Sequence, residues 1–202
     1  KMVRFRTIVE GEEDGDDAGE IQEPGLVGET LELTEARLGA LYKKGLMLDA
    51  QKQLLGASEA FQEVLRDSTL DRDLSADARY AGVRHIKYLC LKNLARVAQE
   101  QGQEEEALRW LGDAVALDGS DVTTWYRLGT TAQGLHRPHV ARCALERALA
   151  LSPRHGPCIE RLCEVLYAIG DMAACVACAE HLKAVCPWNG PKALLIKGMA
   201  LR

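Results

Sequence analysis

The chain has 202 residues, a formal net charge of −5 at neutral pH and only 5% aromatic residues. This length is sufficient for one or two domains with a substantial hydrophobic core. No apolar run is long enough to cross a bilayer, and residues 1–9 lack the long apolar segment of a signal peptide. We therefore expect no membrane partner.

The charge is unevenly distributed along the chain. Residues 1–36 carry 3 basic and 11 acidic residues, and the remainder carries 22 basic and 19 acidic ones. We expect residues 1–33 to form a flexible acidic arm, because the block GEEDGDDAGE (Gly11–Glu20) has no apolar surface to bury. The arm is either a solvated linker or a contact site for a basic partner such as a histone. The remaining body, at 22 − 19 = +3, does not indicate direct nucleic-acid binding.

Five of the 7 cysteines lie between Cys158 and Cys186. Without a secretory signal, we interpret all of them as reduced thiols of an intracellular protein. The pair Cys175-Val-Ala-Cys178 has the spacing of paired zinc ligands, so a zinc site is the alternative. Zinc knuckles need a turn between such ligands, whereas this pair lies in a helical pattern, where cysteine serves as a small buried residue. We predict no metal and no cofactor.

A helical repeat occupies most of the body. In a unit over residues 122–155, Trp125 takes position 4, Gly129 position 8, Ala141 position 20 and Pro153 position 32. This is the spacing of the 34-residue tetratricopeptide (TPR) repeat. Small residues at positions 8 and 20 allow two antiparallel helices to cross closely, and the proline ends the second helix. The unit therefore predicts a helical hairpin.

The same spacing recurs along the chain. Small residues take positions 8 and 20 in the other units as well: Gly45, Ala57, Ala95, Ala107, Cys163 and Cys175. We predict an all-α TPR helical-hairpin solenoid over residues 34–202 that starts near Thr34. Its repeats lie near 38–71, 88–121, 122–155 and 156–189, with an insertion or helix extension at 72–87 and a terminal helix at 190–202.

The predicted solenoid has a candidate binding face. In the TPR pattern, positions 2, 5, 6, 9, 12 and 13 of each first helix line a concave groove. Position 6 reads Lys43, Asn93, Arg127 and Arg161, which gives a basic-leaning stripe. The stripe is either a solvated charged face or a groove for an acidic or polar peptide. The candidate partner-binding residues are Lys43, Lys92, Asn93, Arg96, Tyr126, Arg127 and Arg161.

The sequence contains no signature of catalysis. It lacks a phosphate-binding glycine loop, a nucleophile elbow and a paired-carboxylate motif, so we expect a binding protein rather than an enzyme. One alternative is a co-chaperone or adaptor that binds peptide tails in the groove. Only Lys92 and Arg161 match the carboxylate clamp of such TPR proteins, so the clamp is not supported. An enzyme with a helical accessory domain would need catalytic sequence beyond Arg202.

Three segments also resemble the N-terminal repeats of the calcineurin-binding protein Cabin family: LKNLA (Leu91–Ala95), ALDGSDVTTWYRLG (Ala116–Gly129) and PRHGPCIERLCEVLYAIGD (Pro153–Asp171). That family provides the large subunit of the HIR/HIRA histone-chaperone complex. The resemblance implies a nuclear scaffold for replication-independent nucleosome assembly. It also implies a WD-repeat HIRA-type subunit and a ubinuclein-type subunit as partners, with histones as a further one.

Overall fold

The computed structural model describes residues 30–71, 78–187 and 190–201. The chain divides into residues 1–30 and a compact unit over 31–202, which alone is described below. The expectations for the acidic arm up to residue 29 and for residues 72–77 lie outside the described residues. All regular elements within those ranges are helical, which confirms the predicted all-α class.

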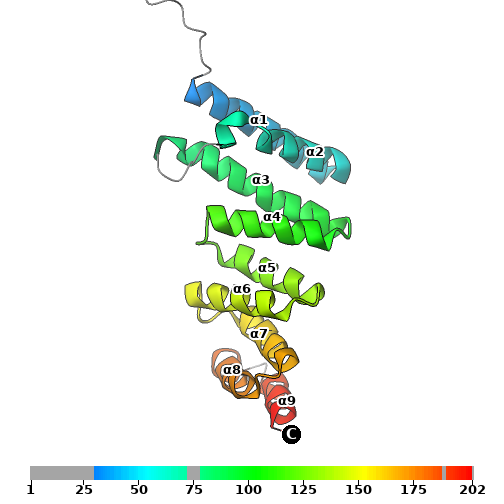
Figure 1. The fold of residues 1–202 in the computed structure, drawn as a ribbon, viewed down its shortest axis with the longest axis vertical. Helices are drawn as coiled ribbons and strands as arrows, with labels where there is room; N and C mark the ends of the chain where they lie inside the picture. The colour runs from blue at the N-terminus through cyan, green and yellow to red at the C-terminus, as the bar shows by residue number, and fades with distance from the viewer. Residues whose placement is uncertain (1–29, 72–77, 188–189, 202) are drawn as a thin grey trace, which may run out of the picture. The chain divides into compact units, whose positions relative to one another are not determined.

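Four hairpins and a ninth helix follow one another along the unit (Figure 1). The hairpins are α1 (Leu31–Ala50) with α2 (Leu54–Leu65), α3 (Ala81–Glu100) with α4 (Glu104–Leu117), α5 (Val122–Gly134) with α6 (Pro138–Leu151), and α7 (Gly156–Ile169) with α8 (Met172–Val185). Helix α9 (Gly190–Ala200) packs on α8. Each second helix contacts the first helix of the next hairpin, so the stack is continuous, as the repeat predicted.

The first two hairpins have longer first helices than the repeat requires. Helices α1 and α3 have 20 residues each, and their additional turns cover residues 31–37 and 81–87. Helix α1 thus begins at Leu31, not at Thr34, whose side chain is 2% exposed inside the helix. Residues 78–87 of the predicted insertion are a short 3₁₀ turn and the extension of α3. The extension packs Val83 into the same core cluster as Leu70, which precedes it in η1 (Ser68–Asp71).

Positions 8 and 24 carry residues of different size in every hairpin, and in the first and third hairpins the two positions face each other. The pairs are Gly45 with Phe61, Ala95 with Leu111, Gly129 with Leu145, and Cys163 with Ala179. A Cβ atom on Gly45 would lie 2.5 Å from Phe61, and one on Gly129 would lie 2.7 Å from Leu145. Where the first helix has a larger residue, as at Cys163, the second helix has only alanine. The crossing therefore depends on the combined bulk of the pair.

The other predicted repeat positions also occupy structural sites. Position 20 is fully buried in all four hairpins: Ala57, Ala107, Ala141 and Cys175. Trp125 is only partly buried, because its indole lies against the core edge and donates to the carbonyl of Gly119 at 2.9 Å. Pro153 is exposed in the turn that follows the end of α6 at Leu151.

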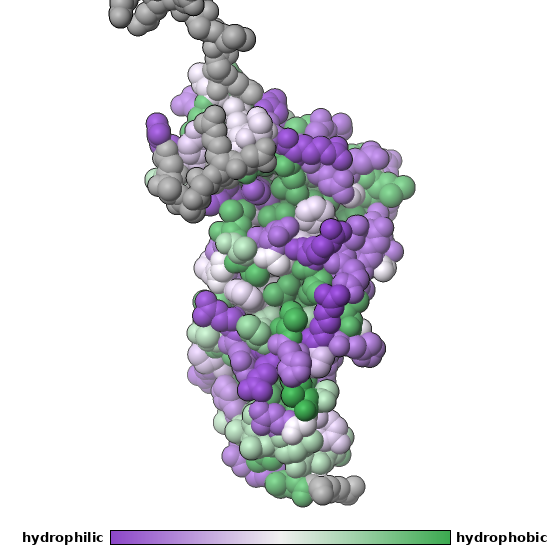
Figure 2. Space-filling view, in the orientation of Figure 1, coloured by the Kyte–Doolittle hydropathy of each residue, from purple (hydrophilic) through white to green (hydrophobic). Residues whose placement is uncertain are grey.

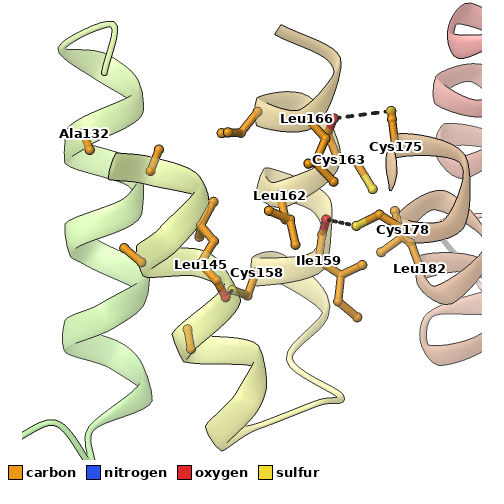
Figure 3. Packing of buried hydrophobic residues seen from close by; sticks show 14 of the residues in the cluster. Ala132, Leu145, Cys158, Ile159, Leu162, Cys163, Leu166, Cys175, Cys178 and Leu182 are labelled. Atoms are coloured by element: carbon orange, nitrogen blue, oxygen red, sulfur yellow. Dashed lines mark hydrogen bonds between the residues drawn. The ribbon is translucent and has the colours of Figure 1, made fainter. Parts of the chain in front are cut away.

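The cysteines of the last hairpin, on α7 and α8, serve as small core residues (Figure 3). The thiol of Cys158 donates to the carbonyl of Leu145 at 3.3 Å, and the thiol of Cys178 donates to that of Ile159 at 3.4 Å. Burial raises the pKa of Cys158 to about 12, so this thiol stays protonated. All seven cysteines are free, and Cys143 is the exposed one. Within the described ranges, no group of three or more His, Cys, Asp or Glu is arranged to hold a metal ion.

The surface of the unit carries both polar and apolar residues. Figure 2 shows hydrophilic residues interspersed with hydrophobic ones over α1–α6, whereas paler and greener residues dominate near α8 and α9. Leu194, Leu195 and Met199 of α9 are exposed. None of the described helices has an apolar stretch long enough to cross a membrane.

Candidate protein-binding face

The predicted partner-binding residues lie on α1, α3, α5 and α7, the first helices of the four hairpins. We call the surface formed by these side chains and their polar neighbours the first-helix face. Its predicted members are Lys43, Lys92, Asn93, Arg96, Tyr126, Arg127 and Arg161. Lys43 is exposed on α1, and no other described residue pairs with it. The remaining six are joined to neighbouring helices by polar contacts.

Two of these contacts join α1 to α3. The amide of Asn93 donates to the hydroxyl of Tyr42 at 3.1 Å. The guanidinium of Arg96 pairs with Asp49 at 2.5 Å and also with Glu100. Hydrogen bonding to Asp49 raises the pKa of Arg96 above its ordinary value, so the pair stays charged. The charge of Arg96 is therefore already balanced within the chain.

Asp121 joins α3 to α5. It is the N-cap of α5 and accepts from the backbone N–H of Thr123 at 2.8 Å. Its carboxylate also accepts from the ammonium of Lys92 at 2.5 Å and from the hydroxyl of Tyr88 at 2.6 Å. Burial alone would raise the pKa of Asp121, but the hydrogen bonds from Lys92, Tyr88 and Thr123 outweigh it and hold this pKa far below its usual range. Burial and the bond to Asp121 raise the pKa of Tyr88 to about 12.

Arg127 makes the second bridge between α3 and α5, and its partners are neutral. One Nη donates to Oε1 of Gln99 at 2.7 Å, and the other donates to the carbonyl of Lys92 at 3.4 Å. The amide of Gln99 in turn donates to the hydroxyl of Thr131 at 2.6 Å. Burial and the positive charge of Arg96 lower the pKa of Arg127. The charge of Asp121 acts on Arg127 in the opposite direction but only partly offsets these effects, and no carboxylate of the described residues hydrogen-bonds to this half-buried cation.

A final set of contacts joins α5 to α7. The amide of Gln133 donates to Glu164 at 3.2 Å, and the same carboxylate pairs with Arg161 at 3.0 Å. Hydrogen bonds to Glu164 and to Tyr126 raise the pKa of Arg161. The ring of Tyr126 lies 5.3 Å from that of His155, the N-cap residue of α7. Tyr126 of α5 and Arg161 of α7 therefore lie close together on the first-helix face.

The sequence reasoning missed the residues that bridge the first helices. Position 12 reads Asp49, Gln99 and Gln133 in the first three hairpins, and each contacts a side chain of the next first helix. This recurrence at a fixed repeat position was the available signal. As a result, the face alternates between paired charges and amides and is not a continuous basic stripe. It offers a hydrogen-bonding surface whose side chains are held by contacts between successive first helices.

A model of the CABIN1 N-terminal domain matches residues 35–200, which run from within α1 to the end of α9. The chain belongs to the CABIN1 N-terminal domain family. Calcineurin-binding protein 1 of Arabidopsis thaliana is 33% identical over 151 residues, which cover 73% of this chain and 8% of that protein. The chain therefore spans only a small part of the length of this relative.

Solved structures show the same fold. A tetratricopeptide repeat protein from Parabacteroides merdae has a TM-score of 0.66 and 16% identity, covering 82% of this chain and 59% of that one. The first TPR of Spaghetti (RPAP3), solved with the HSP90 peptide SRMEEVD, has a TM-score of 0.52 and 17% identity over 57% of this chain and 91% of that one. These likenesses confirm the TPR solenoid. Such solenoids function as protein-interaction scaffolds through their surfaces.

Proposed function

We propose that this CABIN1-family domain is an interaction scaffold within a nuclear histone-chaperone complex of the HIR/HIRA type, which assembles nucleosomes independently of replication. Family membership over residues 35–200 is the observation that carries this proposal. The expected partners are a WD-repeat HIRA-type subunit and a ubinuclein-type subunit, with histones as a further partner. The role is non-enzymatic, and the domain holds partners in place rather than transforming them.

The first-helix face is the proposed contact surface. Its side chains are held by bonds between successive first helices, for example Asn93 to Tyr42 and Gln133 to Glu164. A surface fixed in this way loses little side-chain entropy when a partner binds. It also presents hydroxyl, amide and charged groups in a defined order, which favours recognition of a polar peptide segment.

The proposal is tested by affinity purification of the tagged chain from nuclear extract, followed by mass spectrometry. We expect the wild-type chain to retain the WD-repeat subunit. The double reversal Arg127→Glu with Arg161→Glu should lose it, because both residues lie on the first-helix face. The matched control, Arg147→Glu with Arg154→Glu, makes the same change in net charge at exposed residues of α6 and the following turn. Equal retention by both double variants would exclude the first-helix face as the contact surface.

The second candidate is an adaptor for chaperone tails, favoured by the RPAP3 likeness and by the clamp-like positions of Lys92 and Arg161. In this chain both cations already bind carboxylates, since Lys92 pairs with Asp121 and Arg161 with Glu164. A tail carboxylate would have to displace them. We therefore expect the fluorescence anisotropy of a labelled SRMEEVD peptide to stay unchanged when the chain is added. Saturable binding would instead support the adaptor role.

A further inference from the structure

We propose that Arg127 is the docking point for a single carboxylate of a mostly neutral peptide segment of the partner, received between α3 and α5 on the first-helix face. This inference deepens the protein-binding role proposed above and rests on it. It assigns the contact to one residue, Arg127, and to one ligand group, a carboxylate, instead of to the whole basic stripe.

Arg127 has hydrogen-bond donors that no described residue uses. A guanidinium has five N–H donors in one plane. One donor is directed at Oε1 of Gln99 and one at the carbonyl of Lys92, and both acceptors are neutral. The other donors bind no described residue, and no carboxylate hydrogen-bonds to the group, since Asp121 acts on it only through its charge. A carboxylate arriving here would supply both the missing acceptors and the missing charge.

The neighbouring cations differ from Arg127 because each is already paired with a carboxylate. Lys92 lies 2.5 Å from Asp121, Arg96 lies 2.5 Å from Asp49, and Arg161 lies 3.0 Å from Glu164. At each of these positions a peptide carboxylate would have to displace one that is already bound. Among the half-buried cations predicted for this face within the described residues, Arg127 alone requires no displacement. An incoming anion is therefore directed to this residue.

The guanidinium of Arg127 is already held in position before a ligand binds. Gln99 holds the guanidinium and is itself held by its bond to Thr131 on α5. The backbone carbonyl of Lys92 on α3 fixes the second Nη. Because both helices hold the planar group, little conformational freedom is left to lose when a two-oxygen anion binds side-on.

The surroundings indicate a peptide rather than a nucleic acid. Asp49, Glu100 and Asp121 all lie among the cations of this face. A polyanion that follows the face would meet these carboxylates, whereas nucleic-acid sites present continuous basic surface. A single acidic side chain or chain terminus can reach Arg127 without approaching all of them. The ligand is therefore an isolated carboxylate within a mostly neutral peptide.

Selection from a library of random short peptides displayed on phage tests the proposal. The library is panned against the wild-type chain, against Arg127→Gln, and against Arg147→Gln, a matched control at an exposed arginine of α6 outside the first-helix face. We expect the wild-type and Arg147→Gln pools to be enriched in Asp or Glu at one position and the Arg127→Gln pool to lose that enrichment. Equal acidic enrichment in all three pools, or none in the wild-type pool, would overturn the proposal.

A second measurement separates recognition from folding. A peptide from the wild-type pool should bind Arg127→Gln about tenfold more weakly, the loss typical of one charged hydrogen-bonded contact. Arg127→Lys keeps the charge but not the planar donors, so it should show intermediate affinity. Both variants must keep the wild-type thermal midpoint within a few degrees for the comparison to count. If the variants bind as tightly as the wild type, the assignment of Arg127 is wrong.

The outcomes also separate this inference from the function proposed above. Acidic selection that depends on Arg127, together with no retention of chaperone subunits from nuclear extract, would preserve the site and refute the complex. Retention of the subunits by an Arg127→Gln chain would preserve the complex and refute the site.

Discussion

A Cβ atom on Gly129 would lie 2.7 Å from the Cγ of Leu145 on the facing helix. Real Cβ atoms do not approach so closely, so the crossing of α5 and α6 excludes any side chain here unless Leu145 moves. In the last hairpin, the corresponding pair is Cys163 with Ala179. Here the larger residue is on the first helix, whereas in the third hairpin it is on the second helix. The size relationship between positions 8 and 24 is therefore a property of the hairpin and not of glycine alone.

The first prediction concerns overpacking of this crossing. Gly129→Leu should destabilise the chain by about 1–3 kcal/mol, because the new side chain must separate two packed helices. For a domain of this size each kcal/mol corresponds to about 2–4 °C in the thermal midpoint. The control is Gly112→Ala on α4, where an added Cβ has open space and should not lower the midpoint. An unchanged melting curve for Gly129→Leu, measured by circular dichroism, would show that the helices do not cross here.

The second prediction uses the fourth hairpin as the template for a repair. Gly129→Cys alone should lower the midpoint, because even a thiol is too large beside Leu145. Adding Leu145→Ala should recover part of that loss, since the double variant reproduces the pair Cys163 and Ala179. The double-mutant cycle should give a coupling free energy of about 0.5–3 kcal/mol in the favourable direction. Additive effects of the two changes would contradict size compensation.

The repeat could be predicted from the sequence because small residues leave a periodic signature. The spacing of Gly45, Ala95, Gly129 and Cys163 fixes where the helices cross, and hence the class of fold. The start of α1 at Leu31 could not be predicted from the same spacing, whereas the extension of α3 was one of the two alternatives left open for residues 72–87. They arise from contacts outside the repeat, such as Arg37 to Asp67 at 2.5 Å and the burial of Val83 beside Leu70. Such contacts join residues whose separation in sequence follows no period.

The third prediction concerns the charge of Asp121. Asp121→Asn keeps a good N-cap for α5 but removes the charged acceptor of Lys92 and Tyr88, so we expect a loss of about 1.5–3 kcal/mol at neutral pH. The folded pKa of Asp121 lies far below the unfolded value of about 3.9. This stabilisation is therefore complete at neutral pH and declines as the unfolded chain takes up a proton below about pH 5.

The wild-type and Asp121→Asn midpoints should accordingly differ most at neutral pH and converge on acidification. Thermal melts of both chains across this pH range provide the measurement. A difference that stays constant with pH would mean that the carboxylate is not held in its charged form by its partners.

The fourth prediction concerns thiol accessibility. Cys143 is exposed, whereas the other cysteines are buried, and burial raises the pKa of Cys90 and of Cys158 to about 12. Treatment of the native chain with a thiol-specific chromogenic reagent should modify one cysteine quickly and the rest only on unfolding. Peptide mapping should place the modification on Cys143, and Cys143→Ser should abolish the fast phase. Rapid labelling of Cys175 or Cys178 would contradict their placement in the core.

The fifth prediction creates a second anion site. Glu164 neutralises Arg161 at 3.0 Å, so Glu164→Gln should free that guanidinium for a ligand. Acidic peptides selected on the wild-type chain should then bind more tightly, and the gain should fall at high salt because it is electrostatic. Adding Arg161→Gln should cancel the gain. If Glu164→Gln leaves affinity unchanged, neutralisation by chain carboxylates does not control binding on this face.

The candidate site could be predicted only in part, for a physical reason. The repeat positions placed Lys92, Arg96, Arg127 and Arg161 on one face, because position within a helical repeat fixes direction. The available charge on each depends instead on its neighbours from other helices. Arg96 is balanced by Asp49 from α1, whereas Arg127 bonds only to the neutral groups of Gln99 and the Lys92 carbonyl. The spacing of residues along the sequence does not distinguish these two cases.

We infer that a protein partner binds across the first helices of the stacked hairpins. Hydrogen exchange measured by mass spectrometry, with and without the partner recovered from nuclear extract, provides the decisive test. We predict that binding slows exchange in α3, α5 and α7 and leaves α4, α6 and α8 unchanged. Protection confined to α4, α6 and α8 would contradict the claim and place the binding surface on the second helices.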